Sequence, residues 1–502
     1  MGETVVLTTE GTYPFHRGGV STWCQMLING MPQTSFEVLA LVSSPFLKIQ
    51  YELPANVMKV HSVPMWGLEQ PMEHNHGEAY SLLLRKHFDT TDHVVKRDFL
   101  PVLSEFLEHI LHDDGDPLEL GVILARMHSY FRLYDYRLTW FSAMTWGTIS
   151  HQLREHWARE HPLKAEPSPS EIKQAFRLLY HLLVILDKRL LSPDIIHSSA
   201  AGFCGIPGIL SKLAFGTPYL LTEHGVYIRE QFLNLRRYVK SVFVRSFLYK
   251  LMMAIVRCNY AYADQTSPVC AYNARWERWL GADPEQIKVI FNGVDETKFC
   301  PQPRAPRSTP LVSTVGLIFP LKGQIDLIEA AGQLRQSIPD TEYRVYGSAS
   351  DQEYYAECCA RVSKLGLDGL FNFAGTTNSP WQVYSEADVV VFPSISEAFP
   401  YALIEAMLCG AAVVATDVGG VPEALGDAGL LVRPHAPNQL ADALHFLLKD
   451  PTRRSRLGEA ARIRALRYFK QSDFISCYAQ SYSRLQSPSN LPELVAPAEM
   501  YS

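Results

Sequence analysis

Short apolar runs alternate with amphipathic stretches along most of the chain. In the first half the runs are Val5–Thr9, Val38–Val42, Ile195–His197 and Tyr219–Thr222. Unbroken runs of this kind are typical of strands buried on both faces of a parallel sheet. The first run leads through a glycine-bounded loop to a helical pattern over Val20–Gly30. The pattern therefore predicts a β-loop-α start and a parallel sheet that helices cover on both faces.

A second series with the same rhythm fills the C-terminal half. Helical patterns such as Gly323–Gln336 and Tyr401–Leu408 separate its apolar runs. The predicted strands are Leu311–Val315, Tyr343–Tyr346, Leu370–Phe373, Val389–Phe392 and Ala412–Ala415. A strand about every 20–30 residues fits the right-handed crossovers of a doubly wound sheet. We therefore expect an α/β protein with two such sheets.

The chain is too long for one hydrophobic core. It has 502 residues, and single cores stop growing at roughly 250–300 residues. Cys300–Pro310 contains four prolines and no apolar periodicity, which predicts a linker. We expect an N-terminal acceptor-side domain over 1–300, with a largely helical insertion at about 71–191, and a C-terminal nucleotide-binding domain over 311–470. In the last segment, 471–502, we expect a helix over Ser472–Leu485 that crosses back to the first domain and is followed by a polar tail.

Composition narrows the class of protein and its location. The net charge of −6 supplies no positive field for a nucleic-acid backbone, so we expect no nucleic-acid partner. No basic segment followed by a long apolar run opens the chain, and no window reaches about 18 uninterrupted apolar residues. Nine cysteines without a C-x-x-C pair indicate reduced thiols. We expect a cytoplasmic protein.

One stretch allows contact with a membrane. Lys240–Arg257 places four basic residues among Val, Phe, Leu and Met. This composition fits a helix that lies peripherally on the inner face of a membrane. It equally fits a half-buried domain helix with a solvated basic edge. Both interpretations stay open.

The segment Ser394–Met407 carries two carboxylates after a predicted strand. Pro400 suits the first turn of a helix, so Glu397 should lie in the loop and Glu405 about two turns inside. At the carboxyl edge of a doubly wound sheet, free amide groups at a helix start bind phosphate, and carboxylates accept hydrogen bonds from sugar and ribose hydroxyls. Taken alone, the two residues equally fit a helix-start carboxylate on a solvated loop and a surface residue.

Several motifs in order carry a family resemblance. Glu397 and Glu405, with seven residues between them, resemble the E-x7-E signature of the retaining family 4 glycosyltransferases. Asn292–Asp295 with Phe299 resembles the interdomain segment of that family, and Asp417–Glu423 resembles its loop after the glutamates. The resemblance implies the GT-B fold, in which two Rossmann-like doubly wound domains face a cleft. It also implies a retaining, metal-independent transfer from a UDP-sugar, without a cofactor.

Two segments of the first half narrow the resemblance. Gly11–Trp23 and Thr222–Tyr227 are similar to segments of the PelF-type enzymes of Pel exopolysaccharide synthesis. This likeness implies a hexosyltransferase that moves a hexose or N-acetylhexosamine, with UDP-glucose as the first candidate donor, to a glycan acceptor in exopolysaccharide biosynthesis. It also implies a membrane polysaccharide synthase complex as a partner.

Two phosphate-binding elements are expected. Gly18 and Gly19 precede a helix, where the absence of side chains lets a donor phosphate approach the backbone, and Arg17 can pair with a diphosphate. A tight turn and a surface arginine are the alternatives. Gly316–Gly323 resembles the family's phosphate loop, whose arginine and lysine neutralise the leaving diphosphate. Lys322 matches the lysine.

Leu317 departs from the family, because arginine is usual at its position. One charge of the clamp is therefore missing. Either Arg17 compensates, or the donor is held differently, or activity is weak.

His224 follows a predicted strand and matches the histidine that contacts the donor sugar in many relatives. A neutral imidazole there can hydrogen-bond a sugar hydroxyl, and a structural histidine is the alternative. Its neighbour Glu223 is expected close to the acceptor. His74 and His76 lie in a polar segment without a tetrahedral partner set, so we expect no metal site.

The predicted site has two groups of members. The catalytic residues are His224, Glu397 and Lys322, and the donor- or nucleotide-binding residues are Gly18, Gly19, Arg17, Gly316, Lys322, Glu397, Ala398, Phe399 and Glu405. Two rival functions stay open, because a fold does not determine the reaction that a protein catalyses. The first is a GT-B phosphorylase or epimerase. The second is a catalytically weak or inactive glycosyltransferase-like scaffold of a membrane synthase, for which Leu317 is the main evidence.

Overall fold

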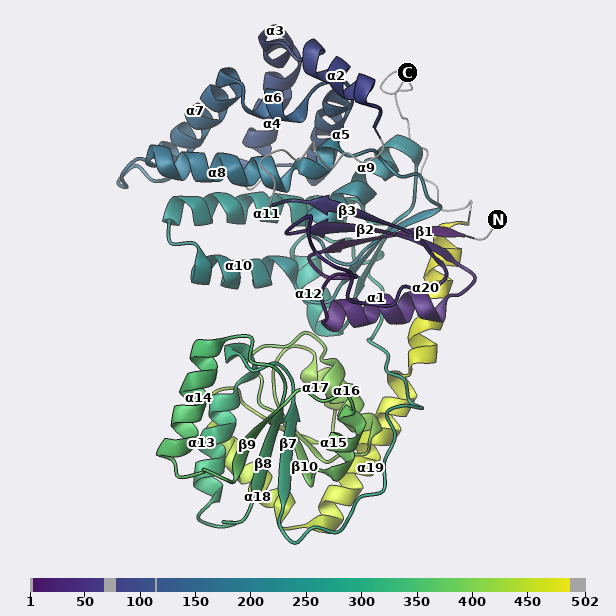
Figure 1. Cartoon of the computed structure of the whole chain (residues 1–502), viewed down its shortest axis with the longest axis vertical. Coiled ribbons are helices and arrows are strands. Elements are labelled where there is room, and N and C mark those ends of the chain that lie inside the picture. Colours follow the sequence, from purple (N-terminus) through teal and green to yellow (C-terminus); the bar gives the residue numbers. More distant parts are fainter. Residues whose placement is uncertain (1–2, 67–77, 113–114, 488–502) are drawn as a thin grey trace. The chain divides into compact units, whose positions relative to one another are not determined.

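The computed structural model describes residues 3–66, 78–112 and 115–487, shown as a cartoon in Figure 1. By their contacts these residues form two compact units. The first unit holds the described residues up to Pro268, with Arg275–Lys288 and the chain from Ala479. The second holds Val269–Ala274 and Val289–Tyr478, so the proline-rich segment 300–310 groups with the second unit.

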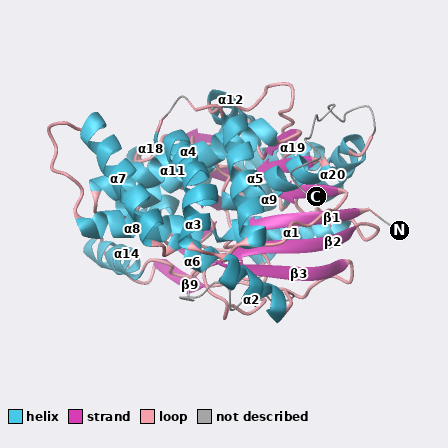
Figure 2. Ribbon diagram, turned by 90° about the horizontal axis from the view of Figure 1, so that it is seen from above, coloured by secondary structure: helices cyan, strands magenta, loops and turns pink. Residues whose placement is uncertain are grey.

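The first unit is built on six parallel strands in the order β3-β2-β1-β4-β5-β6. They are β1 (Thr4–Glu10), β2 (Ser35–Val42), β3 (Val57–Pro64), β4 (Ile195–Ser198), β5 (Tyr219–Glu223) and β6 (Gln265–Pro268). Figure 2 shows β1, β2 and β3 side by side. The winding reverses between β1 and β4, and ligands bind at such a switch point in open α/β sheets.

Helices surround this sheet, and a run of them forms the insertion. The insertion contains α2 (Tyr80–Asp89), α3 (Asp92–Val94), η2 (Val95–Phe99), α4 (Leu100–Leu111), α5 (Pro117–Leu133), α6 (Tyr136–Trp140), α7 (Ala143–Glu160), α8 (Pro169–Leu182) and η3 (Val184–Asp187). The other helices of this unit are α1 (Gly19–Gly30), η4 (Phe203–Gly205), α9 (Ile206–Phe215), α10 (Tyr227–Tyr238) and α11 (Val242–Tyr262). Two further helices, α12 (Ala271–Trp279) and α20 (Gln471–Leu485), each contribute residues to both units. The described residues between 78 and 187 are thus mainly helical.

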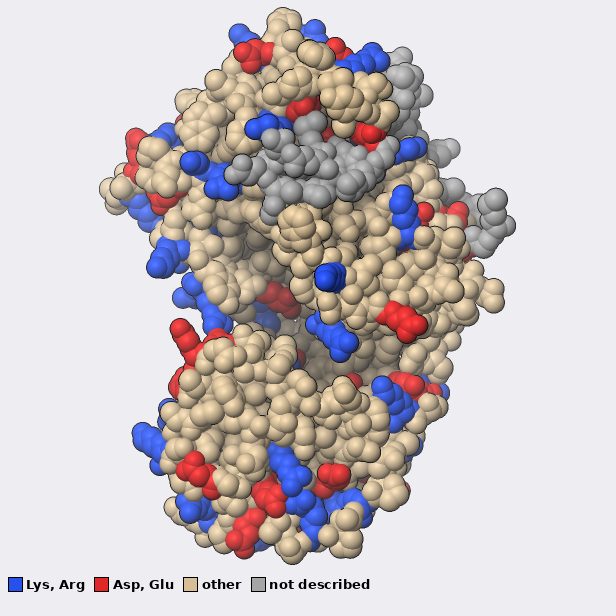
Figure 3. All heavy atoms as spheres, viewed as in Figure 1, with Lys and Arg blue, Asp and Glu red and all other residues tan. Residues whose placement is uncertain are grey.

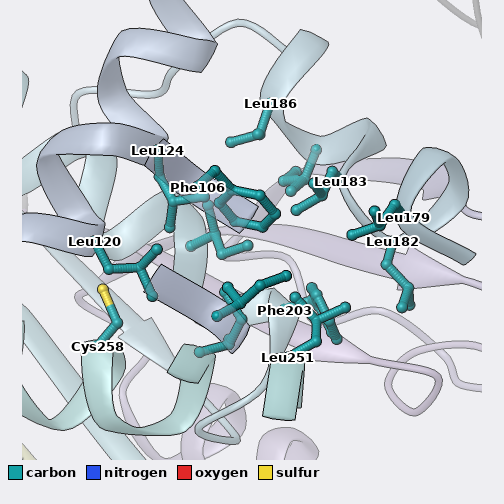
Figure 4. Packing of buried hydrophobic residues seen from close by; sticks show 14 of the residues in the cluster. Phe106, Leu120, Leu124, Leu179, Leu182, Leu183, Leu186, Phe203, Leu251 and Cys258 are labelled. Atoms are coloured by element: carbon teal, nitrogen blue, oxygen red, sulfur yellow. The ribbon is translucent and has the colours of Figure 1, made fainter. Parts of the chain in front are cut away.

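The insertion and the sheet share one hydrophobic core. Phe106 of α4 and Leu179 of α8 lie in one cluster with Phe203 of η4 and Leu251 of α11 (Figure 4). Burial of a large apolar side chain stabilises a fold by about 1.5–3 kcal/mol. The insertion is therefore an integral part of the first unit.

The second unit repeats the architecture with the strand order β12-β11-β10-β7-β8-β9, again all parallel. Its strands are β7 (Leu311–Val315), β8 (Glu342–Tyr346), β9 (Phe371–Gly375), β10 (Val389–Phe392), β11 (Val413–Thr416) and β12 (Leu430–Val432). Its helices are η5 (Pro320–Lys322), α13 (Gln324–Leu334), α14 (Gln352–Lys364), α15 (Pro380–Glu386), α16 (Tyr401–Leu408), α17 (Val421–Leu425), α18 (Pro437–Leu448) and α19 (Pro451–Tyr468).

Each face of the second sheet has its own core, because side chains alternate along a strand. In β10, Val390 and Phe392 join the cluster that contains helix α16. Val389 and Val391 join the cluster on the other face, with helices α13 and α18. Figure 1 shows α13 and α14 covering that second face. The doubly wound architecture is thus confirmed for both units.

Three strands are missing from the sequence-based prediction. β6 consists of Gln265–Pro268 and has no apolar run, although every residue in it is buried. β12 is only three residues long, and β3 is an edge strand in which only Val63 and Pro64 are buried. Within the described ranges, no helix combines the length and the apolar content needed to cross a membrane. His74 and His76 lie outside the described residues.

Candidate functional site

The switch point of the second sheet lies between β7 and β10. From β7 the chain winds to β8 and β9, whereas from β10 it winds the other way to β11 and β12. The loop Gly316–Gly323 follows β7, and the loop Pro393–Pro400 follows β10. Because both strands are parallel neighbours, their following loops meet at the carboxyl edge of the sheet. These loops carry most of the predicted donor-binding residues.

The two loops are held together through the backbone. Ile395 N–H donates to the carbonyl oxygen of Leu321 at 2.8 Å. Gly323 has φ 65°, and a Cβ added there would lie 2.0 Å from the carbonyl oxygen of Pro393. Only glycine therefore allows this approach. Gly323 also starts α13 without a side-chain cap. The Ile325 N–H donates to the Tyr354 hydroxyl at 3.2 Å, so the helix start acts on a ligand mainly through its partial positive charge.

Lys322 and Glu397 form an ion pair across this switch point. The Lys322 Nζ contacts Glu397 Oε1, and Ser394 Oγ donates to the same carboxylate oxygen at 2.7 Å. Both charged side chains are partly buried, with 27% and 13% of their surfaces exposed. Partial burial strengthens a charge pair relative to one in open water. The structure thus places two of the three predicted catalytic residues in direct contact.

Ala398 and Phe399 are positioned by their backbones. The Ala398 carbonyl accepts from Gly420 N–H at 2.7 Å, and the Phe399 carbonyl accepts from the Asn292 side-chain amide at 3.0 Å. The Phe399 ring is buried and stacks on Phe291 with 5.3 Å between centroids. The side chain of Phe399 therefore belongs to the core, and only its backbone is available to a ligand.

Glu405 lies on α16, a little more than one turn from its start at Tyr401, rather than two turns inside. Its Oε2 accepts a hydrogen bond from the Tyr384 hydroxyl at 2.9 Å. Burial raises the pKa of Glu405 to about 7, while the Tyr384 hydrogen bond and the charge of Lys298 lower it by less. A carboxyl group that titrates near neutrality both donates and accepts hydrogen bonds at physiological pH.

Leu317, at the position of the missing arginine, has a side chain that is 48% exposed. Its carbonyl accepts from the Gln324 side-chain amide at 2.9 Å. Gly316 precedes it at the end of β7 and donates its N–H to the carbonyl of Tyr346. Hydrogen bonds to the backbone atoms of Gly316 and Leu317 therefore hold this part of the loop in place.

The predicted phosphate-binding element of the first unit follows β1. Arg17, Gly18 and Gly19 are exposed. Gly18 begins α1 without a side-chain cap, and nothing lies within 4 Å of a Cβ added there. The start of this 12-residue helix is thus open to a ligand. The loop is fixed on its inner side, where Ser21 Oγ donates to the carbonyl of His16 at 2.6 Å.

His224 follows β5 and lies against α1. Its ring meets the ring of Trp23 edge-on, with 4.8 Å between centroids. The buried Nε2 atom has no hydrogen-bond partner within the described part of the chain. Removal of the ring from water lowers the pKa of His224 to about 3, so the imidazole is neutral at physiological pH. A neutral imidazole can hydrogen-bond a hydroxyl but carries no charge to neutralise a phosphate.

Glu223, next to His224, lies in the core and not at the surface. The side chain is fully buried, with 0% exposed, and its oxygens accept from Tyr227 N–H and the Tyr260 hydroxyl. The Glu223 side chain therefore faces the core, and its closeness to an acceptor stays a prediction. Its strand ends one residue later than the apolar pattern suggests, which turns Glu223 into the core.

The sequence analysis also did not identify the buried residues that pack around His224. Trp23 contacts both His224 and His197, whose ring centroid lies 5.2 Å from that of Trp23. His197 in turn contacts the Tyr482 hydroxyl at 2.7 Å and the Thr222 hydroxyl at 2.8 Å. Trp23 ends a segment that carries the family resemblance, but no pattern in the sequence connects it to residues about two hundred positions away.

Two doubly wound sheets of six parallel strands, each with ligand-binding loops at a switch point, define the GT-B class of fold. Solved structures of this class agree. Sucrose-phosphate synthase from Thermosynechococcus elongatus is similar with a TM-score of 0.60 and 18% identity, covering 96% of this chain and 99% of that one. HepE from Anabaena, in complex with UDP and glucose, has a TM-score of 0.58 and 16% identity, covering 96% and 100%.

The chain belongs to the family described as Domain of unknown function (DUF3492), which matches residues 3–285. Residues 295–464 match the family Glycosyl transferases group 1. The boundary between the two matches thus falls close to the start of the second unit's main segment at Val289.

Curated relatives resemble parts of the chain. A D-inositol 3-phosphate glycosyltransferase of an Arthrobacter species is 37% identical over 201 residues, which is 37% of this chain and 47% of the relative. Alpha-maltose-1-phosphate synthase of Mycolicibacterium smegmatis is 28% identical over 322 residues, which is 58% of this chain and 79% of the relative. The match thus spans about half the length of the first relative.

Proposed function

We propose that the chain is a retaining glycosyltransferase that moves a hexose or N-acetylhexosamine from a UDP-sugar to a glycan acceptor in exopolysaccharide biosynthesis. The observation that carries this proposal is the Lys322–Glu397 pair at the β7/β10 switch point, in the unit that matches Glycosyl transferases group 1. A positive group and a carboxylate at this edge suit a ligand that is anionic at one end and rich in hydroxyls at the other.

Lys322 supports the departure of the diphosphate. Its ammonium has three donors, and Glu397 occupies one of them, so the others can bind phosphate oxygens. The start of helix α13, immediately after Gly323, adds partial positive charge. Negative charge on the leaving group grows as the glycosidic bond breaks, so these groups stabilise the transition state more than the ground state.

Glu397 and His224 orient the donor sugar in this proposal. The Glu397 carboxylate accepts hydrogen bonds from hydroxyls while Ser394 and Lys322 hold it in place. His224 stays neutral and hydrogen-bonds a hydroxyl. Retention follows if the acceptor hydroxyl attacks from the side that the diphosphate leaves. Glu405 is proposed to accept hydrogen bonds from the ribose.

We propose that neither a metal nor another cofactor takes part. Lys322, Arg17 and the helix-start N–H groups are the groups expected to neutralise the diphosphate. Turnover should therefore survive dialysis against a chelator and should not rise when Mg²⁺ or Mn²⁺ is added. A strict requirement for either ion would contradict this part of the proposal.

UDP-glucose is the first candidate donor. Support comes from the likeness of the fold to HepE, which has been solved in complex with UDP-glucose. The PelF-type motifs support a role in exopolysaccharide synthesis and, as a partner, a membrane polysaccharide synthase complex.

One experiment separates the proposal from its rivals. Purified protein is incubated with UDP-glucose, UDP-galactose and their N-acetyl forms, and release of UDP and the fate of the sugar are measured. Transfer or slow hydrolysis with one donor supports the proposal. Interconversion of the UDP-sugars indicates an epimerase, and phosphate-dependent release of sugar phosphate from a glycan indicates a phosphorylase. UDP binding without turnover of any donor indicates a scaffold.

We also propose that the first unit binds peripherally to a membrane that contains anionic lipids. Residues 231–245 contain four basic residues and no acidic one. Exposed apolar residues share this stretch of α10 and the start of α11: Phe232, Leu233, Tyr238 and Val242. Figure 3 shows Lys and Arg side chains at the edge where α10 ends and α11 begins. Basic groups beside exposed aromatic rings suit an anionic headgroup layer.

Vesicle binding tests this second proposal. The triple variant Arg236→Ser, Arg237→Ser, Lys240→Ser should lose about 3 kcal/mol of binding, roughly a hundredfold, to vesicles that contain phosphatidylglycerol. The control is the same exchange at three exposed residues of the second unit, Arg433, Lys449 and Arg456. Equal binding of the wild type to vesicles of pure phosphatidylcholine would contradict the proposal.

A further inference from the structure

The Trp23 side chain of α1 packs edge-on against two histidine rings of the first unit. It is 0% exposed. Its ring centroid lies 4.8 Å from that of His224, with 75° between the ring planes, and 5.2 Å from that of His197, with 89° between the planes. Aromatic rings prefer such edge-to-face arrangements at separations of about 4.5–7 Å. Trp23 therefore joins a histidine of the proposed site to a histidine of the core.

His197 gives this packing a fixed base. It belongs to β4 and is 0% exposed. Its Nδ1 atom hydrogen-bonds the Tyr482 hydroxyl at 2.7 Å, and its Nε2 atom hydrogen-bonds the Thr222 hydroxyl at 2.8 Å. The Tyr482 ring also meets the His197 ring edge-on, with 5.7 Å between centroids. Because both ring nitrogens have partners on other elements, the His197 ring cannot rotate without breaking a buried hydrogen bond.

His224 lacks such an anchor at its Nε2 atom. The residue is partly exposed, but this atom is buried and has no hydrogen-bond partner in the described part of the chain. The torsion that turns an imidazole about its last side-chain bond has broad minima, so a ring nitrogen without a hydrogen bond leaves the direction of the ring to its packing. Contact with Trp23 is therefore what orients the His224 ring.

Trp23 also lies on the helix that opens with the proposed phosphate-binding element. α1 begins at Gly19, the second of the two glycines proposed to meet a donor phosphate, and Trp23 follows one turn later. His197 lies on β4, and His224 follows β5, the neighbour of β4 in the sheet. One helix thus carries both the proposed phosphate-binding start and the ring that contacts the proposed sugar-binding histidine.

We infer that Trp23 is a positioning residue for the transfer reaction: its indole, packed on the fixed His197 ring, holds the His224 ring in the direction that the donor sugar requires. This inference rests on the proposed function, in which His224 hydrogen-bonds a hydroxyl of the donor. Trp23 itself touches neither donor nor acceptor and acts through the histidine. Loss of the indole frees the His224 ring to turn, so fewer molecules hold it in the productive direction.

Two substitutions at Trp23 test this role. Trp23→Leu removes the ring and should lower turnover of the UDP-sugar that the wild type uses by about tenfold to a hundredfold, since a misplacement of about 1 Å in an active site can cost 10²-fold. Trp23→Phe keeps an aromatic ring and should recover most of the loss. If Trp23→Leu does not fold, Trp23→Met, which fills the space without a ring, replaces it in every comparison. Equal losses in the ring-free variant and in Trp23→Phe, or no loss in either, would overturn the inference.

Trp140→Leu is the matched control. Trp140 is also 0% exposed and belongs to the same unit. Its ring packs against Phe99 and Phe176 of the insertion. The same exchange there should lower the free energy of unfolding in a similar way but leave turnover per folded molecule unchanged. An equal loss of turnover in the variants of Trp140 and Trp23 would indicate a general effect of a core cavity, against the inference.

A double-mutant cycle shows whether Trp23 acts through His224. His224→Asn alone should lower turnover. Adding Trp23→Leu should then change turnover by less than about twofold, because the effects of two residues that act through one group do not add. A second loss as large as that of Trp23→Leu alone would mean that Trp23 acts independently of His224, and the inference would fail.

The direction of the ring can be measured without activity. In crystals of the full chain with Trp23→Leu, the His224 ring should be turned or occupy more than one orientation, whereas in Trp140→Leu it should keep the orientation of the wild type. An unmoved ring in Trp23→Leu would overturn the inference. A turned ring in a protein whose wild type turns over no donor would confirm that Trp23 orients His224 and would count against the proposed function alone.

Discussion

Lys322 is the residue on which the proposed chemistry depends most. It supplies a positive group at the β7/β10 switch point, where Leu317 supplies none. We expect Lys322→Ala to lower turnover by about 10²–10³-fold, the effect of removing one transition-state donor, and to weaken UDP binding by less. Donor turnover and titration calorimetry with UDP measure the two effects.

The matched control for this change is Lys449→Ala, because Lys449 is an exposed lysine of the same unit. It should behave like the wild type. Equal losses of turnover in both variants, or an unaffected Lys322→Ala, would remove Lys322 from the mechanism.

Glu405 predicts a pH dependence of nucleotide binding. Its pKa is raised to about 7 by burial, and the proposed ribose contact needs an acceptor. UDP affinity should therefore rise as pH increases through 7, and Glu405→Ala should weaken it at alkaline pH. Glu405→Gln should remove the pH dependence. Affinity that stays constant across this range in the wild type would rule out a carboxylate contact.

The same shift affects stability. Since the folded-state pKa of Glu405 exceeds that of the unfolded chain, its favourable contribution is present at acidic pH and is lost as pH rises from the ordinary carboxyl value of 4.5 to about 7. Glu405→Gln should therefore be closest to the wild type in stability at low pH and differ from it most above 7.

At the scale of elements, the contact between the loops after β7 and β10 depends on one glycine. Gly323→Ala combines a strained φ of 65° with a Cβ placed 2.0 Å from the carbonyl of Pro393. Gly375→Ala has a φ of 73° but no atom within 4 Å of its Cβ. Both should lose about 1–2 kcal/mol of stability from backbone strain. Only Gly323→Ala should lose more and also bind UDP less well, as denaturant unfolding and calorimetry will show.

The open start of α1 allows stability and binding to be separated. A carboxylate at Gly18 would cap the helix and stabilise it by a few tenths of a kcal/mol relative to glycine. It would also repel a diphosphate. Gly18→Asp should therefore keep or raise the melting temperature while lowering donor turnover, whereas Gly18→Asn, a neutral cap of the same shape, should lower turnover less. Equal turnover in the two variants would argue against a phosphate at α1.

At the scale of the whole molecule, the two units should respond differently to the nucleotide. A ligand at a hundred times its Kd adds about 2.7 kcal/mol to the stability of the part that binds it. UDP should therefore slow hydrogen exchange in β7 and β10 of the second unit more than in β2 and β3 of the first. Uniform protection of both sheets, or protection of the first sheet alone, would contradict assignment of nucleotide binding to the second unit.

Much of the architecture could be predicted because local pattern and tertiary fold agree. The mainly apolar runs Leu311–Val315 and Val389–Phe392 coincide with β7 and β10, since strands buried on both faces are usually rich in apolar residues. β6 could not be found in this way. Its Gln265 is buried because Ser267 and Ser481 accept from its side-chain amide, and the second of these lies more than two hundred residues away.

The sequence by itself determined the doubly wound class and the loops that carry Lys322, Glu397 and Gly18, because strand, turn and helix-start signals are local. Only the tertiary structure decided what these side chains contact. It joined Lys322 to Glu397, laid His224 against Trp23 and buried Glu223 against the Tyr260 hydroxyl. Contacts of this kind depend on which distant segments the sheet order brings together, and burial then sets the charge of each group.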